Sequence, residues 1–190
     1  QNIWKNTEAP IPVFRRRIEA LTMTHPFVVW RLWSDKPFDK ERSLFAGTTG
    51  LGIIDNISLY ERFETNSKTW ANKTGGSVVE LHAYGVDPKM TEAEIRQDLK
   101  AGLNAAYPES RTHNFIEERY MHRQDCPGFK PGQDADRPTV QTPWHTLRLA
   151  GDNVKLPYPS ALMERAAKSG MIAANGMLAG WGARTEAQPT

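Results

Sequence analysis

The stretch that decides most of the fold is Ser77-Val78-Val79-Glu80-Leu81-His82-Ala83-Tyr84-Gly85-Val86, in a chain of 190 residues. Neighbouring side chains of a β-strand point to opposite faces, so the residues of one face recur at every second position. One face of this stretch is apolar and the other is mostly polar: Val79, Leu81 and Ala83 against Val78, Glu80, His82 and Tyr84. The sequence therefore predicts a strong strand over 77–86.

A helix is predicted directly after this strand. Thr91 can cap its start, and Glu94 follows three residues later, which is the spacing of a capping box. The helix ends at Tyr107-Pro108. Apolar residues recur at every fourth position on one of its faces, as Ile95, Leu99 and Leu103. The pattern predicts a helix that packs on a sheet through this face.

Strand and helix patterns are interleaved along the rest of the chain. The expected strands are 27–33, 114–122 and 146–150, the expected helices are 10–21, 56–71 and 160–179, and 124–143 is a long loop. This interleaving predicts an α/β or α+β fold, with a mixed β-sheet covered by helices.

The composition is that of a soluble globular protein, with 39% hydrophobic and 24% charged residues. A formal net charge of +2 is too small to indicate nucleic acid as a partner. Cys126 is the only cysteine, so no internal disulfide is expected. No apolar run approaches the roughly 20 residues of a membrane span. The chain begins with Gln1 and not with methionine, which indicates a processed product or a fragment.

A basic run, Arg15-Arg16-Arg17, lies in the first expected helix. It forms either a solvated face or a contact with an anionic lipid surface. The start of the chain lacks the apolar segment of a secretion signal. The sequence therefore predicts a cytoplasmic protein, either free or peripheral on a membrane.

The other candidate sites favour ordinary structural roles. His113, His122 and Cys126 do not have the spacing of a compact metal site, so no metal is predicted. The glycine loop 47–52 has the spacing G-x-x-G-x-G, the reverse of a dinucleotide fingerprint. The catalytic residues are left unknown, although three polar groups lie on expected strands, namely His82, Tyr84 and Arg148.

The C-terminal part carries the most specific pattern. The strand at 146–150 ends in Gly151-Asp152, where glycine permits close approach and the carboxylate can accept hydrogen bonds from hydroxyls. A loop with two prolines then leads into a helix, whose free N–H groups and positive dipole end suit a negatively polarised oxygen. Small residues follow along this helix at Ala166, Gly170, Ala173 and Ala174. The pattern is typical of a helix that faces a cofactor or packs closely on another element.

This stretch resembles the C-terminal flavin-binding motif of the FAD-dependent amine oxidase and carotenoid desaturase superfamily. The segments 150–157, 161–166 and 169–170 are similar to the phytoene-desaturase-like branch, especially to isorenieratene-synthase-like carotenoid desaturases. Weaker similarity at 30–33, 75–84 and 123–127 extends the resemblance over about residues 10–182.

The resemblance implies FAD as cofactor and a role for each matched position. Asp152 would hold the ribityl or pyrophosphate region, with Gly151 giving clearance, and the backbone at Leu162 and Met163 would face the flavin pyrimidine edge. The full set of implied FAD-binding residues is Gly151, Asp152, Pro159, Ser160, Ala161, Leu162 and Met163. The implied division is a substrate domain over 1–143, an FAD-binding strand and helix over 144–182, and a polar tail over 183–190.

The function implied is that of the C-terminal half of an FAD-dependent oxidoreductase. Its substrate would be a large apolar isoprenoid such as a carotenoid, and the reaction a desaturation or ring aromatisation. Members of the superfamily begin with a G-x-G-x-x-G unit that 1–190 lacks, so a second polypeptide with this nucleotide-binding fold is expected as partner. The alternative is a non-catalytic structural or binding subunit of a larger assembly.

Overall fold

The computed structural model describes residues 12–185 and divides them into two compact units. The sheet unit comprises residues 25–125, and the terminal unit comprises residues 12–24 together with 126–185. The sequence places a boundary at 143/144 instead. The structure thus assigns 126–143 to the same unit as the C-terminal helix.

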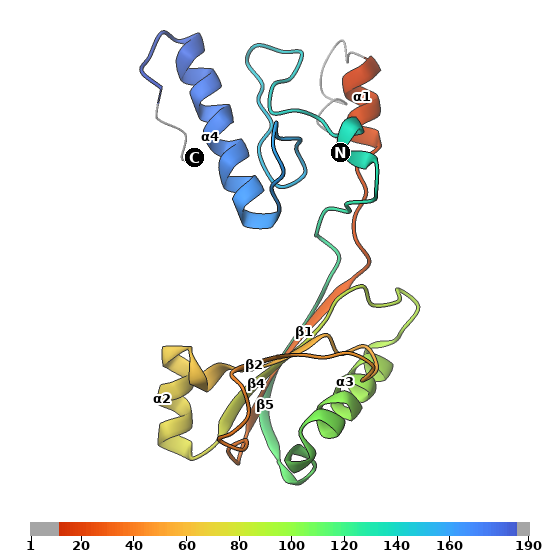
Figure 1. Ribbon diagram of the computed structural model, residues 1–190, viewed down its shortest axis with the longest axis vertical. Helices are drawn as coiled ribbons and strands as arrows, with labels where there is room; N and C mark the ends of the chain where they lie inside the picture. Colours follow the sequence, from red (N-terminus) through yellow and green to blue (C-terminus); the bar gives the residue numbers. More distant parts are fainter. Residues whose placement is uncertain (1–11, 186–190) are drawn as a thin grey trace. The chain divides into compact units, whose positions relative to one another are not determined.

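The sheet unit is built on five antiparallel strands (Figure 1). They are β1 (Phe27–Ser34), β2 (Phe45–Gly47), β3 (Asn56–Leu59), β4 (Ser77–Ala83) and β5 (Phe115–Arg123), in the spatial order β2-β3-β4-β1-β5. The strand predicted at 77–86 is the central β4, which pairs with β1 and β3. The sequence predicts a mixed sheet, whereas each strand pairing in the structure is antiparallel. The predicted combination of a sheet with covering helices is confirmed.

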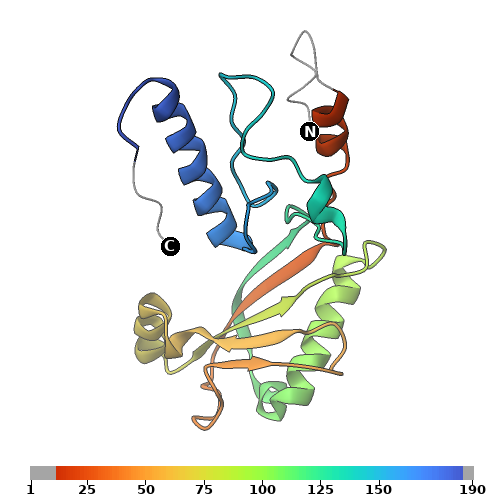
Figure 2. The same cartoon turned by 45° about the horizontal axis from the view of Figure 1, so that its top comes forward.

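Two α-helices and two short 3-10 helices complete this unit. They are η2 (Tyr60–Arg62), α2 (Thr65–Thr74), α3 (Glu92–Ala106) and η3 (Pro108–Thr112). The predicted capping box of α3 is confirmed, because the Thr91 side chain accepts from the Glu94 backbone and the Glu94 side chain accepts from the Thr91 backbone. Figure 1 and Figure 2 show α3 running alongside the sheet.

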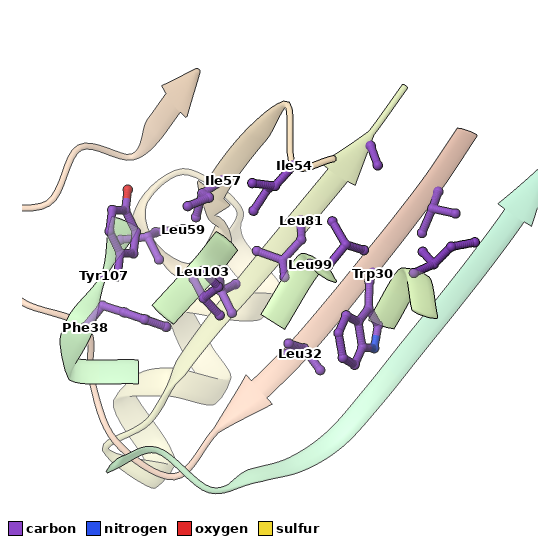
Figure 3. Close-up of a cluster of buried hydrophobic side chains, with 14 of the residues drawn as sticks. Trp30, Leu32, Phe38, Ile54, Ile57, Leu59, Leu81, Leu99, Leu103 and Tyr107 are labelled. Carbon is purple, nitrogen blue, oxygen red and sulfur yellow. The ribbon is translucent and has the colours of Figure 1, made fainter. Parts of the chain in front are cut away.

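The core of the sheet unit lies between α3 and one face of the sheet (Figure 3). Leu99 and Leu103 of α3 meet Leu81 of β4, and all three side chains are fully buried. Alternate residues of β1 reach the same core, as Val28, Trp30 and Leu32. The apolar face predicted for β4 and the apolar stripe predicted for α3 therefore pack against each other.

The helix predicted over 56–71 is wrong in its first half. Residues 56–59 form β3, which pairs with β2 and β4, and the helix starts only at Thr65. Ile57 and Leu59 alternate with Asn56 and Ser58, which is the two-residue period of a strand. The helix begins where it does because the Glu64 carboxylate accepts hydrogen bonds from the first backbone N–H groups of α2.

The terminal unit contains α1 (Pro12–Glu19), the 3-10 helix η4 (Gln133–Asp136) and α4 (Leu162–Gly180). Residues 10 and 11 of the first predicted helix and residues 186–190 of the predicted tail lie outside the described residues. A small apolar core joins α4 to the loops, through Val140, Val154, Leu156 and Ala173. None of the described helices combines the length and the apolar character needed to cross a bilayer.

The strand predicted at 146–150 is wrong. Only Arg148 makes a β-bridge there, with Gln141, and no ladder forms. The Arg148 guanidinium instead lies within hydrogen-bond distance of the carbonyl oxygens of Trp144, His145 and Leu147, which closes a local loop. Gly151-Asp152 is therefore delivered to α4 by a looped segment and not by a regular strand.

The chain leaves and re-enters the terminal unit at adjacent positions. The backbone N–H of Thr24 donates to the carbonyl oxygen of Cys126 at 3.0 Å, and the N–H of Gly128 donates to that of Thr22 at 2.7 Å. Met23 and Pro127 form an antiparallel bridge between these bonds. The two halves of the terminal unit are thus joined by backbone pairing.

Candidate functional site

The first candidate site is the start of α4 with the loop that precedes it. Gly151 has a φ of 128°, a backbone conformation that favours glycine. Its N–H donates to the buried Ser169 hydroxyl at 2.8 Å, and that hydroxyl lies 3.1 Å from the Gly151 carbonyl oxygen. Ser169 lies inside α4 (Leu162–Gly180), so Gly151 is held against the side of the helix beyond its first turn.

Arg165 fixes the loop that leads into the helix. Its Nε donates to the carbonyl oxygen of Ser160 at 2.7 Å, and one terminal nitrogen donates to that of Val154 at 3.2 Å. The guanidinium also lies 3.7 Å from the Asp134 carboxylate and stacks on the Phe129 ring. A buried guanidinium with several carbonyl partners is a rigid anchor. The path of 151–161 is therefore set by the protein itself.

Arg137 is a second buried guanidinium in the same unit. It donates to the carbonyl oxygens of Gly128 and Asn153 and stacks on the Phe129 ring at 3.8 Å. Burial and the neighbouring Arg165 lower the pKa of Arg137, against the attraction of Asp134 and Asp152. The Asp152 carboxylate therefore lies within electrostatic reach of a buried guanidinium.

The N-terminus of α4 is open to a partner. Ala161 caps it without a side-chain hydrogen bond, and Leu162 has a φ of 50°, which is uncommon for a residue other than glycine. Leu162 and Met163 are exposed, Met163 by 86%. Backbone strain of this kind is found at ligand sites, where the surrounding structure maintains it. Free N–H groups and two apolar side chains therefore face outward at one place.

Two polar groups in the loop that precedes α4 have unused hydrogen-bonding capacity. The Ser160 hydroxyl is buried and has no partner among the described residues. Within residues 12–185 no hydrogen bond or ion pair engages the Asp152 carboxylate, which is half-buried. Buried polar groups are normally satisfied, so the Ser160 hydroxyl indicates a polar ligand. An uncapped helix end, an unengaged carboxylate and an unpaired hydroxyl fit the polar edge and hydroxyl groups of a flavin nucleotide.

The predicted stripe of small residues is only partly buried. The buried side of α4 consists of Arg165, Ser169 and Ala173, one residue per turn. Gly170 has open space around its Cα, so it does not serve close packing. Of the remaining implied FAD-binding residues, Pro159 and Ala161 are exposed beside the helix start.

The second candidate site lies on the sheet face opposite α3. Glu80 of β4 is 4% exposed, and one of its carboxylate oxygens accepts from Arg31 of β1 at 2.6 Å. The other oxygen lies 2.7 Å from Nε2 of His82. The Arg31 guanidinium also stacks on the Tyr60 ring at 3.9 Å. A carboxylate, a guanidinium and an imidazole are therefore assembled on two neighbouring strands.

This polar network continues outward from His82 to Tyr84. Nδ1 of His82 lies 2.7 Å from the Tyr84 hydroxyl, and the Asn56 amide lies 3.4 Å from the same hydroxyl. The Asp55 carboxylate accepts from the Tyr84 backbone N–H at 2.5 Å and so holds this residue where β4 ends. The hydroxyl is thus positioned from two sides.

Ionisation of Glu80 is favoured by its partners. Burial by itself would raise the pKa of the Glu80 carboxyl, but hydrogen bonds from His82, Tyr60 and Arg31 outweigh burial and lower it. Burial and the hydrogen bond to Glu80 raise the pKa of Tyr60. Glu80 is therefore a charged acceptor, and Tyr60 remains a neutral donor.

Sequence reasoning identifies His82 and Tyr84 as polar strand residues but does not recognise the assembly. Glu80 has the same two-residue spacing, which is a usable signal that the three share one face. Arg31 and Tyr60 come from other parts of the chain, and only the strand pairing brings them in. Arg148, the third polar candidate, belongs to the terminal unit and closes a local loop. Among the residues described, no group of three His, Cys, Asp or Glu side chains could hold a metal ion.

Comparison with known proteins identifies relatives that match most of the chain. A family model described as flavin containing amine oxidoreductase matches residues 6–178. The chain is 44% identical over 171 residues to a carotenoid phi-ring synthase of Streptomyces griseus, covering 90% of the chain and 33% of that protein. It is 39% identical over 168 residues to a carotenoid phi-ring synthase of Chlorobaculum tepidum, covering 87% of the chain and 26% of that protein.

Solved structures share the fold at low sequence identity. The PF1083 protein of Pyrococcus furiosus has a TM-score of 0.55 at 12% identity, over 88% of this chain and 35% of that one. An oxidoreductase of Methanosarcina mazei has a TM-score of 0.51 at 16% identity, over 84% of this chain and 36% of that one. In sequence and in structure, the chain spans between about a quarter and a little over a third of the proteins it matches.

Proposed function

Because the chain belongs to the family of flavin-containing amine oxidoreductases, we propose that it is the C-terminal part of an FAD-dependent oxidoreductase acting on a carotenoid. Two relatives are carotenoid phi-ring synthases, and this activity supports a large apolar isoprenoid as substrate and ring aromatisation as reaction. The observation that carries the proposal is the open start of α4, which follows a loop that carries the unengaged Asp152 carboxylate.

The residues of the first candidate site fit FAD. Asp152 would accept hydrogen bonds from ribityl hydroxyls, and the Ser160 hydroxyl would find its missing partner in a polar atom of the cofactor. The N–H groups at Leu162 and Met163 would face the pyrimidine edge, where the positive helix end stabilises negative charge. FAD supplies the capacity to accept a hydride from carbon. The chain contributes orientation, electrostatic stabilisation and exclusion of water.

A nucleotide-binding part is needed to complete the enzyme. The relatives are about three to four times as long as the aligned region, which leaves room for such a part in the same polypeptide or in a second one. The exposed apolar side chains of Leu162, Met163 and Trp181 suit burial against it.

A peripheral membrane location in the cytoplasm is also part of the proposal. An apolar isoprenoid is stored in the bilayer, so the enzyme must collect it at the membrane surface. Arg15 and Arg16 are exposed on α1, although Arg15 also pairs with Glu19. The expected result is co-sedimentation of the intact protein with anionic lipid vesicles, weakened at least threefold by replacing Arg15 and Arg16 with alanine. Equal binding of both proteins would reject this role of the basic run.

The flavin assignment is tested by Asp152→Ala in the assembled enzyme. We expect FAD to be retained about tenfold less tightly, because a hydrogen bond to a charged group is worth roughly 1.5–3 kcal/mol. The fold should be unchanged, since the carboxylate has no hydrogen-bond partner in the described chain. Flavin absorbance after gel filtration measures retention, and far-ultraviolet circular dichroism measures the fold.

The matched control is Asp136→Ala, which removes an exposed carboxylate from the same unit. It should leave FAD retention unchanged. Equal FAD retention in the Asp152→Ala and wild-type enzymes would show that this carboxylate does not hold the cofactor. An assembled wild-type enzyme without flavin would favour the alternative of a non-catalytic subunit.

A further inference from the structure

The proposed function requires a group that accepts a proton. Forming a double bond between two ring carbons breaks one C–H bond on each carbon. One hydrogen leaves with its electron pair as hydride, and the neighbouring carbon loses the other hydrogen as a proton. The electron pair of that second C–H bond becomes the second bond of the C=C. A carbon beside an electron-deficient centre is strongly acidic, so a weak but well-placed base is sufficient.

The hydrogen bonds of the second candidate site have a defined direction. Glu80 is ionised and can only accept, so Nε2 of His82 carries the hydrogen between them. A neutral His82 then has its lone pair at Nδ1, and the Tyr84 hydroxyl must donate to it. Hydrogen therefore points inward at both steps, from Tyr84 to His82 and from His82 to Glu80. One lone pair of the Tyr84 oxygen accepts from the Asn56 amide, and the other remains available.

Exposure increases along the same chain of groups. The side chain of Glu80 is 6% exposed and that of His82 is 20% exposed, whereas Tyr84 is 56% exposed. Here a buried carboxylate is connected through an imidazole to a hydroxyl on the surface. The arrangement resembles a catalytic triad of a hydroxyl, an imidazole and a carboxylate. In such a triad the carboxylate fixes the tautomer of the imidazole.

We propose that Tyr84, His82 and Glu80 form a proton relay that accepts a ring proton from the isoprenoid substrate. This inference rests on the proposed function. The Tyr84 oxygen takes the substrate proton while its own proton moves to Nδ1 of His82. One C–H and one O–H bond break, and one O–H and one N–H bond form. The product is an imidazolium between Tyr84 and the negative Glu80, and it returns its proton to water through Tyr84 after product release.

The neighbours of the relay have distinct supporting roles. Arg31 and Tyr60 donate to Glu80 and keep it negative, so that it stabilises the imidazolium. The Asn56 amide donates to the Tyr84 oxygen and helps to hold it in place. His82 and Glu80 are positioning residues, and Tyr84 is the group that meets the substrate.

The kinetic test uses the intact FAD-loaded enzyme, a carotenoid with cyclic end groups and steady-state formation of product. For Tyr84→Phe we expect kcat to fall at least about 100-fold, within the usual range for general acid–base catalysis, with KM within about twofold. The matched control is Tyr120→Phe, which removes a buried hydroxyl without a partner among the described residues. Its kcat should stay within about twofold of wild type.

The second measurement does not depend on activity. Nitrogen NMR of His82 should show a hydrogen on Nε2 and none on Nδ1, with the Nδ1 signal shifted in Tyr84→Phe and unchanged in Tyr120→Phe. A neutral His82 with its hydrogen on Nδ1 would overturn the relay. So would an active wild-type enzyme whose Tyr84→Phe variant turns over at a similar rate. A flavin-loaded wild-type enzyme inert on carotenoids would overturn the proposed function and the relay with it.

Discussion

Replacing Glu80 by alanine is expected to lower the free energy of unfolding by about 3 kcal/mol, near the lower end of the range for breaking a buried ion pair. The change leaves the Arg31 guanidinium without its counter-ion and the His82 Nε2–H without its acceptor. The Arg31 side chain is 25% exposed, so water recovers part of the loss. Hydrogen exchange of peptides from β1 and β4 measures the effect directly.

A surface pair provides the control for this variant. Arg123 and Asp125 lie 3.4 Å apart in the same unit, and both are more than half exposed. Asp125→Ala should therefore change stability by no more than about 0.5 kcal/mol, as is usual for exposed pairs. If both variants lose the same small amount, Glu80 is not the centre of the polar network.

Gly102→Ala is expected to destabilise the sheet unit by about 2 kcal/mol, against the normal trend for helices. Alanine in a helix interior is favoured over glycine by roughly 1 kcal/mol. At position 102, however, a Cβ would lie 2.5 Å from Cγ2 of Ile54 and 2.7 Å from the backbone oxygen of Leu51. A backbone atom cannot move aside as a side chain can, so α3 would shift away from its core. Denaturant titration measures the loss.

Gly170→Ala is the matched control, because Gly170 lies inside α4 with open space around it. This variant should gain about 0.5–1 kcal/mol in its own unit through helix propensity. The two substitutions are chemically identical, so their opposite signs would isolate the steric term. A stabilising Gly102→Ala would mean that α3 does not approach the loop at Leu51 so closely.

Local signals explain which elements of the fold could be predicted. The strand over β4 and the helix α3 were predictable because their apolar periods and the Thr91 cap act within a few residues of chain. The helix predicted at 56–71 was partly wrong because β3 is only four residues long, and its strand character depends on β2 and β4 on either side. The strand predicted at 146–150 failed for a similar reason. The local pattern favours a strand there, but the Arg148 side chain binds nearby carbonyl groups and closes a loop instead.

The two candidate sites differ in how much of each could be predicted from the sequence. The first site lies within one continuous segment, so Gly151, Asp152 and the start of α4 could be recognised together. The unpaired Ser160 hydroxyl and the strained Leu162 backbone could be recognised only in the folded structure. The second site depends on the pairing of Arg31 with Glu80, which are far apart in sequence. No local sequence pattern predicts that pairing.

The backbone pairing between Thr22–Thr24 and Cys126–Gly128 has a consequence for how such enzymes diversify. The entire segment 25–125 departs and returns at one point, so its length adds little to the entropy of closing the chain. Evolution can therefore replace the sheet unit by another domain whose ends lie equally close together, while the terminal unit with α4 is kept. The two units thus become separately heritable, and a laboratory can recombine them by splicing at the same two points.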